Sequence, residues 1–176
     1  MTRSNGRSFW INTSYKISPD LSLEYRTAGG HLNLKIMLMS NLKRFLDAQR
    51  TDYDVALNEI KSGRKRSHWM WYIFPQIAGL GLTEMSKRYA IRDIGEATDF
   101  LLDKTLGIRL INICQALLAL QTNDALEVFD NPDHLKLRSS MTLFDVISGS
   151  SPVFAWVLDK FYNGERDSRT LELLKS

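Results

Sequence analysis

Apolar residues recur at helical spacing over most of the chain after residue 39. SNLKRFLDAQ presents one apolar stripe, and TDYDVALNEIKSG presents a second that starts after Asp52 and ends before Gly63. Aspartate often caps a helix start because its carboxylate accepts hydrogen bonds from free backbone amides, and glycine often ends a helix. The pattern therefore predicts two short helices before Gly63.

The second half of the chain shows the same periodicity. Helices are predicted after Asp93, after Ser151 with Pro152 in the first position and Gly164 at the end, and after Asp167. LGIRLINICQALLAL is expected to be the longest and most apolar helix, surrounded by the others. These signals leave little room for strands and predict an all-α fold, a compact single-domain bundle of short helices.

The first 38 residues have a different pattern. LSLEYRT and HLNLKIML alternate apolar and polar residues around an Ala-Gly-Gly sequence, which is typical of a β-hairpin. A two-stranded ribbon is marginal by itself, so the alternative is that Met39 is the natural start and the preceding stretch adds little to the fold. We therefore divide the chain into an N-terminal extension, residues 1–38, hairpin-like or poorly ordered, and an α-helical domain, residues 39–176.

Composition agrees with one globular domain. Of the 176 residues, 44% are hydrophobic and 24% charged, and the chain lacks both the apolar block of a secretory signal and the run of about 18 apolar residues that a membrane span needs. We therefore expect a cytoplasmic protein without membrane contact. The single cysteine, Cys114, lies in an apolar stretch and is expected in the core.

Charge and ligand spacing argue against two classes of partner. The net charge of +3 arises in the first 38 residues, which hold five cations and two anions, whereas the rest of the chain balances. A duplex-binding domain usually carries a domain-wide positive surface, so nucleic acid is not the expected partner. Three histidines and one cysteine show no zinc-site spacing, and we predict neither a metal nor a cofactor.

The stretch GRKRSHWMWYIFPQ, residues 63–76, concentrates cations, aromatic residues and a histidine. Pro75 stops any helical turn there, so the segment is short and rigid, and its aromatic residues are too many for one buried face. One interpretation is a core anchor with solvated cations. The other is a ligand pocket in which an indole stacks on a planar group and cations hold its negative charge.

A second concentration of polar residues is NPDHLKLRSSMTLF. Cations beside hydroxyls are a common way of binding phosphate or carboxylate. If one continuous helix begins at Asp133, the side chains of Lys136 and Arg138 point about 200° apart and do not bind the same ligand. We prefer a helix that begins near Ser139 or Ser140, because both cations then lie on the loop before the helix. There they can converge with the hydroxyls at the helix start. The alternative is a plain capped helix that packs in the core.

The order of these blocks resembles one known family. The blocks LKRFLDAQ, YDVALNEIKSGRKRSHWMWYIFPQIAGLG, EATDFL and DHLKLRSSMTLF carry the resemblance, and GRKRSHWMWYIFPQ is its most specific part. From about Asn41 to Leu174 the chain is similar to the bacterial domain-of-unknown-function family 1810, often labelled calpastatin. The resemblance implies a compact, mainly α-helical domain and names no reaction. The label denotes a long disordered protease inhibitor and does not fit a chain this dense in core residues.

We expect residues 63–79 and 133–142 to face each other and form a site for an anionic planar small molecule, such as a nucleotide or an ADP-ribose-like compound. His68 is the candidate proton carrier if the ligand is processed there. The residues predicted to bind the ligand are Lys65, Trp69, Trp71, Gln76, Lys136, Arg138, Ser139 and Thr142. In the alternative hypothesis, the aromatic and basic residues form a protein interaction surface without catalytic activity.

Overall fold

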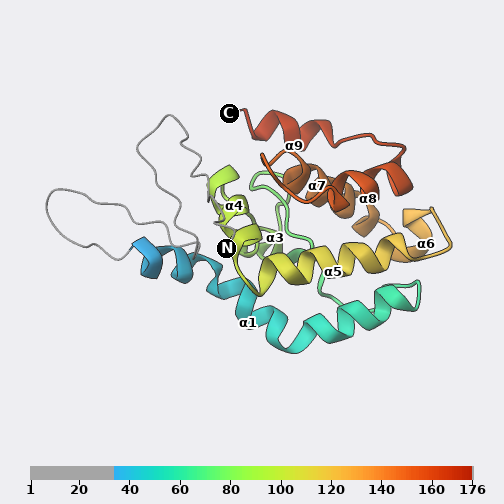
Figure 1. Cartoon of the computed structure of the whole chain (residues 1–176), viewed down its shortest axis with the longest axis horizontal. Coiled ribbons are helices and arrows are strands. Elements are labelled where there is room, and N and C mark those ends of the chain that lie inside the picture. The colour runs from blue at the N-terminus through green and yellow to red at the C-terminus, as the bar shows by residue number, and fades with distance from the viewer. Residues whose placement is uncertain (1–33, 176) are drawn as a thin grey trace, which may run out of the picture. The chain divides into compact units, whose positions relative to one another are not determined.

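A computed structural model describes residues 34–175, with side chains from Leu42 onward (Figure 1). This part of the chain contains nine α-helices and no β-strand, which confirms the predicted all-α fold class. The helices are α1 (Leu34–Lys61), α2 (Met70–Ile73), α3 (Glu84–Arg88), α4 (Ile94–Leu102), α5 (Leu106–Leu118), α6 (Ala125–Phe129), α7 (Asp133–Asp145), α8 (Val153–Tyr162) and α9 (Ser168–Leu173).

The predicted N-terminal extension lies mostly outside the described residues. Contacts within the chain separate Met1–Lys35 from Ile36–Ser176, and the description below concerns the second unit, together with the first two residues of α1. Residues 34–38, which the alternating pattern places in the second arm of a hairpin, are helical and belong to α1. The rest of the predicted hairpin falls on residues that the structure does not describe.

α1 is one long helix where the sequence predicts two short ones, so that prediction is wrong. Asp52 does not cap a helix, because its carboxylate accepts hydrogen bonds from the hydroxyls of Thr51 and Tyr72 instead. No glycine or proline occurs in residues 40–62, so nothing stops the first helical stripe before the second begins. Gly63, with φ of +80°, follows the end of the helix as predicted.

α7 is the central helix of this unit. It packs against α4, α6, α8 and α9, and seven of its thirteen residues are buried. The sequence pointed to residues 106–120 instead, but α5 exposes Ile108 by 57% and is shorter than α1, so that expectation is wrong. The hydroxyls of Ser139 and Thr142 can be buried in α7 because each donates to a backbone carbonyl one turn back in the same helix, at 3.1 and 2.8 Å.

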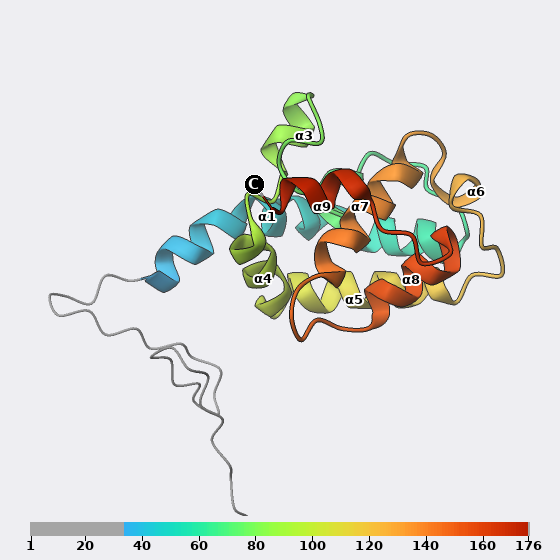
Figure 2. The same ribbon diagram turned by 90° about the horizontal axis from the view of Figure 1, so that it is seen from above.

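α4, α6, α8 and α9 lie around α7, and α5 extends the bundle through its contacts with α4 and α8 (Figures 1 and 2). α5 also meets α1 where the phenol of Tyr53 donates to the carbonyl of Arg109 at 3.1 Å. Lys160 of α8 donates to three carbonyls at the C-terminal end of α5, where the helix dipole favours a cation. Among the helices of residues 34–175, none combines the length and apolar character that crossing a bilayer requires.

Candidate ligand-binding site

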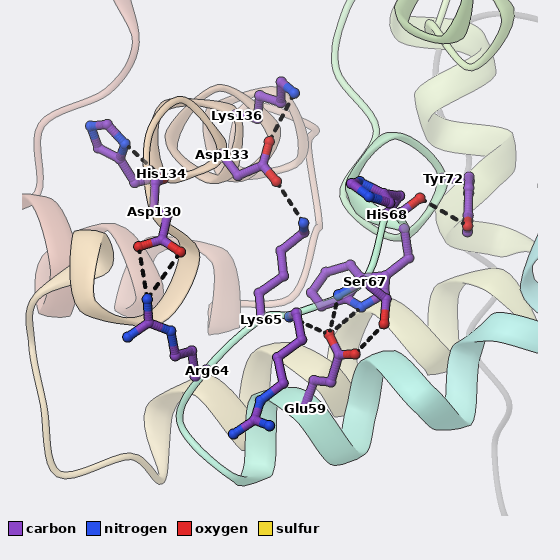
Figure 3. A network of polar contacts seen from close by, with 12 residues as sticks. Glu59, Arg64, Lys65, Ser67, His68, Tyr72, Asp130, Asp133, His134 and Lys136 are labelled. Carbon is purple, nitrogen blue, oxygen red and sulfur yellow. Dashed lines mark hydrogen bonds and ion pairs between the residues drawn. The ribbon is translucent and has the colours of Figure 1, made fainter.

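Glu59, in the last turn of α1, holds the segment that follows this helix (Figure 3). Its carboxylate accepts hydrogen bonds from the backbone amides of Arg66 (2.7 Å) and Ser67 (3.0 Å), from the Ser67 hydroxyl, and from Nε1 of Trp69 (2.8 Å). One side chain thus fixes the path of residues 64–69.

These hydrogen bonds favour the ionised form of Glu59. Burial opposes its ionisation, but the Ser67 hydroxyl, the two amides and the indole outweigh burial and lower the pKa of Glu59 to about 2, from an ordinary value of 4.5. The negative end of a helix dipole disfavours a carboxylate in the last turn. Sequence reasoning missed Glu59, although an acid at this unfavourable position is a signal that it has tertiary partners.

The segment after α1 meets the first turn of α7 at an ion-pair cluster formed by Lys65, Asp133 and Lys136 (Figure 3). The Lys65 Nζ atom lies 2.7 Å from Oδ2 of Asp133, and the Lys136 Nζ atom lies 2.8 Å from Oδ1. Burial opposes the ionisation of Asp133, but its hydrogen bonds with Lys136 and Lys65 outweigh burial and keep its pKa below the usual range. The two segments expected to face each other are therefore in contact.

Each lysine of this cluster also lies over an indole ring. The Lys65 Nζ atom is 5.2 Å from the ring centroid of Trp69, and the Lys136 Nζ atom is 4.7 Å from that of Trp71, both within the range of cation–π attraction. Trp69 is only 1% exposed, whereas Trp71 is half-buried. Of these two indoles, Trp71 is the one with surface available to a ligand.

Trp71 also borders a small cavity of about 150 Å³ between α2 and α3. Gln76, Ser86, Lys87 and Tyr89 are among the other lining residues. The side-chain amide of Gln76 makes no hydrogen bond to another described residue, so its donors and its acceptor are open to a ligand. Apolar cavities of about this volume hold a molecule the size of benzene, so the hollow has room for one ring.

The chain between α2 and α4 forms a loop, residues 78–90, that supplies much of the cavity lining. A parallel bridge between Ile77 and Ile91, with two backbone hydrogen bonds of 2.8 Å, joins the two ends of the loop. α3 lies within the loop, has no buried residue and stands at the edge of the helical body in Figure 2. At the base of the loop, a Cβ atom added to Gly79 would lie 3.1 Å from a side-chain carbon of Leu173 in α9.

α7 runs without a break through DHLKLRSS, so the preferred helix start near Ser139 or Ser140 is wrong. The preceding proline and the acid in the first turn favour the earlier start. Lys136 and Arg138 consequently have different partners. Arg138 donates to the Glu165 carboxylate at 2.9 Å and to two nearby backbone carbonyls at 3.0 and 3.2 Å, outside the cluster with Lys136.

Ser139 and Thr142, the predicted hydroxyl ligands, are buried in the packing of α7. Both hydroxyls donate to the backbone of their own helix, and the Thr142 oxygen also accepts the backbone amide of Asp167 at 2.8 Å. Together with Arg138, Thr142 ties α7 to the connection between α8 and α9. These side chains have structural partners and do not lie with Trp71 at the cavity.

His68, the predicted proton carrier, is exposed. In Figure 3 its ring is directed away from Glu59, and its backbone carbonyl accepts a hydrogen bond from the Tyr72 hydroxyl at 3.2 Å. His68 is not among the residues that line the cavity beside Trp71. Its role in proton transfer stays a prediction.

Comparison with protein-family models matches residues 39–174 to a family described as "Protein of unknown function (DUF1810)". This chain belongs to the DUF1810 family. The match confirms the resemblance carried by the sequence blocks between residues 41 and 174. The crystal structure of the conserved hypothetical protein Rv1873 from Mycobacterium tuberculosis is similar, with 41% identity, a TM-score of 0.75, and coverage of 77% of this chain and 97% of that one.

Comparison with curated proteins finds no significant match. Neither the DUF1810 description nor the name of the mycobacterial protein states a reaction or a ligand. The function of this DUF1810 protein is therefore argued from the geometry of the site.

Proposed function

We propose that this DUF1810 domain binds a planar small molecule that carries negative charge, such as a nucleotide or an ADP-ribose-like compound. The observation that carries the proposal is the position of Trp71, which borders the cavity and lies 4.7 Å, from ring centroid to Nζ, from Lys136. One indole is thus shared by a ring-sized hollow and a positive cluster. A planar ring in the hollow packs against this indole while its charged part lies near the cations.

The charge of the ion-pair cluster supports an anionic ligand. Lys65 and Lys136 share the single carboxylate of Asp133, so the cluster keeps an excess of one positive charge. The three side chains are 10%, 21% and 16% exposed, respectively. Water and salt screen partly buried charges less than exposed ones, so this excess acts on a bound anion across a short distance.

The polar residues near Trp71 suit a heterocyclic ring. The open amide of Gln76 offers two donors and an acceptor at the cavity, which matches the mixed edge of a nucleobase. His68 is assigned only as the candidate proton carrier, because catalysis requires it to reach a reacting atom of the bound ligand. The proposal therefore concerns ligand binding and does not include a reaction.

The proposal is tested by titrating the protein with AMP, ADP and ADP-ribose in a calorimeter. Trp71→Leu is expected to weaken the binding of these compounds about tenfold or more, since stacking of a base on an aromatic ring contributes about 1–3 kcal/mol. Trp156→Leu is the matched control, because Trp156 lies on α8, is 55% exposed and does not line the cavity. Circular dichroism checks that both variants stay folded.

Two results would contradict the proposal. Failure of the unmodified protein to bind any of the three compounds rejects an anionic nucleotide ligand. Equal losses in Trp71→Leu and Trp156→Leu reject the location beside Trp71.

The alternative function, a protein interaction module, needs both tryptophans of residues 63–76 on an open surface. Trp69 is 1% exposed and donates its indole N–H to Glu59, and Trp71 borders a cavity. This arrangement supports a small ligand better than a flat protein contact, so we place the interaction hypothesis second.

A further inference from the structure

The cavity beside Trp71 has a cation of its own that the sequence did not single out. Lys87 of α3 is one of its lining residues. The adjacent Arg88 has its guanidinium carbon 5.4 Å from the ring centroid of Tyr89, which also lines the cavity. Lys136 of α7 lies over the ring of Trp71 but does not line the hollow, so Lys87 is the cation at the cavity itself.

These cations differ in how firmly they are paired. Lys136 is 21% exposed and bound to Asp133, which is 16% exposed, and water competes poorly for such partly buried charges. Lys87 is paired with Glu84 at 3.3 Å, but their side chains are 60% and 95% exposed. An exposed pair of this kind contributes little, because water and salt screen it. A ligand anion therefore replaces Glu84 beside Lys87 more readily than Asp133 beside Lys136.

The loop of residues 78–90 places Lys87 at the cavity on an exposed helix. Its two ends are fixed by the bridge between the buried residues Ile77 and Ile91, while α3 buries no residue. Compact loops of about 6–16 residues with closely spaced ends frequently carry functional side chains. Tyr89, near the end of the loop, is buried against Phe45 and Tyr72, so the loop is anchored to the core beside Lys87 while Lys87 itself stays exposed.

We infer that Lys87, and not Lys136 or Arg138, holds the negative group of the ligand. The inference rests on the proposed function and narrows it. A ring in the hollow and an anion at Lys87 place the charge within a short distance of the ring, as in a mononucleotide. Arg138 is engaged with Glu165, and Lys136 completes the cluster that positions Trp71.

The test compares AMP with adenosine, because the two differ only in the phosphate. The affinity ratio of AMP to adenosine is measured by calorimetry for the unmodified protein and for Lys87→Gln, Lys136→Gln and Arg169→Gln. Arg169→Gln is the matched control, because Arg169 forms an i,i+3 pair with Glu172 on α9 with side chains 61% and 63% exposed. Lys87→Gln is expected to lower the ratio about tenfold, the effect of losing one charge-assisted hydrogen bond.

The control is expected to leave the ratio within about twofold, and Lys136→Gln to lower it less than Lys87→Gln does. If Lys87→Gln leaves the affinity ratio unchanged, the inference is overturned while the proposed function stands. A larger effect of Lys136→Gln than of Lys87→Gln has the same consequence. Equal binding of AMP and adenosine by the unmodified protein also overturns it. Failure to bind AMP at all overturns the proposed function, and the inference with it.

Discussion

The two segments that flank Trp71 are held in opposite ways. Residues 64–69 are fixed by the Glu59 carboxylate, which accepts four hydrogen bonds from them. Residues 78–90 are joined at their ends by the bridge between Ile77 and Ile91, and the helix they contain buries nothing. One wall of the site is therefore held by a single hydrogen-bond network, whereas the other is anchored at its ends, where Tyr89 is buried, and leaves α3 without a buried residue.

The two segments therefore have different expected roles: residues 64–69 position the site, and residues 78–90 contact the ligand. The fixed segment places Lys65 against Asp133 and buries Trp69, so its residues belong as much to the fold as to the site. Within the loop, Lys87 lies on α3, which has no buried residue. Substitutions in the first segment are expected to change stability, and substitutions in the second are expected to change ligand binding.

The largest expected effect is that of Glu59→Ala. Loss of the carboxylate leaves two backbone amides and the buried indole N–H of Trp69 without their acceptor, so the free energy of unfolding should fall by about 2–4 kcal/mol. Urea denaturation measures this fall. Glu84→Ala in the loop is the control and should change stability by less than about 0.5 kcal/mol. Equal effects of the two variants would remove the distinction between the walls.

A smaller effect is expected from acid. Because folding lowers the pKa of Glu59 from 4.5 to about 2, its stabilising contribution is complete above pH 4.5 and is lost as the pH falls towards 2. The difference in unfolding free energy between the unmodified protein and Glu59→Gln should therefore be constant from pH 7 to pH 5 and shrink below pH 4.5. A difference that stays constant down to pH 3 would show that the ionised carboxylate is not what holds the segment.

The smallest effect on stability is expected from replacing residues 81–88 with eight alternating glycines and serines. The replaced stretch contains no buried side chain, so the free energy of unfolding should change by less than about 1 kcal/mol, while AMP binding is lost. Replacement of residues 168–173 in α9 with six alternating glycines and serines should lower the free energy of unfolding by more, because α9 packs on α7 and buries Thr170. A larger loss from the loop replacement would mean that the loop is part of the fold.

Local signals in the sequence predicted the fold class and several helix ends. Asp93 and Asp167 cap α4 and α9 by accepting backbone amides three residues later, each at 2.8 Å, as the cap pattern indicates. α8 begins at Val153, one residue later than the predicted start at Pro152, which is the cap residue instead. These features depend on a few neighbouring residues, so one sequence is enough to predict them.

Features that depend on distant partners were not predicted. Asp52 resembles a cap, but its carboxylate faces the Tyr72 hydroxyl from another helix. Arg138 resembles a ligand-binding cation, but the chain brings Glu165 to it. The sequence did not identify Lys87 as a candidate site residue, because only the folded structure places this exposed lysine beside a cavity.

The closeness of Gly79 and Leu173 has a practical consequence. They are 94 positions apart in the chain and meet where α9 contacts the base of the loop of residues 78–90. Shortening the chain before Leu173 would therefore remove the side chain that packs against this base. A spin label or fluorophore attached in this final turn would therefore report on the base of the loop, where Gly79 lines the cavity.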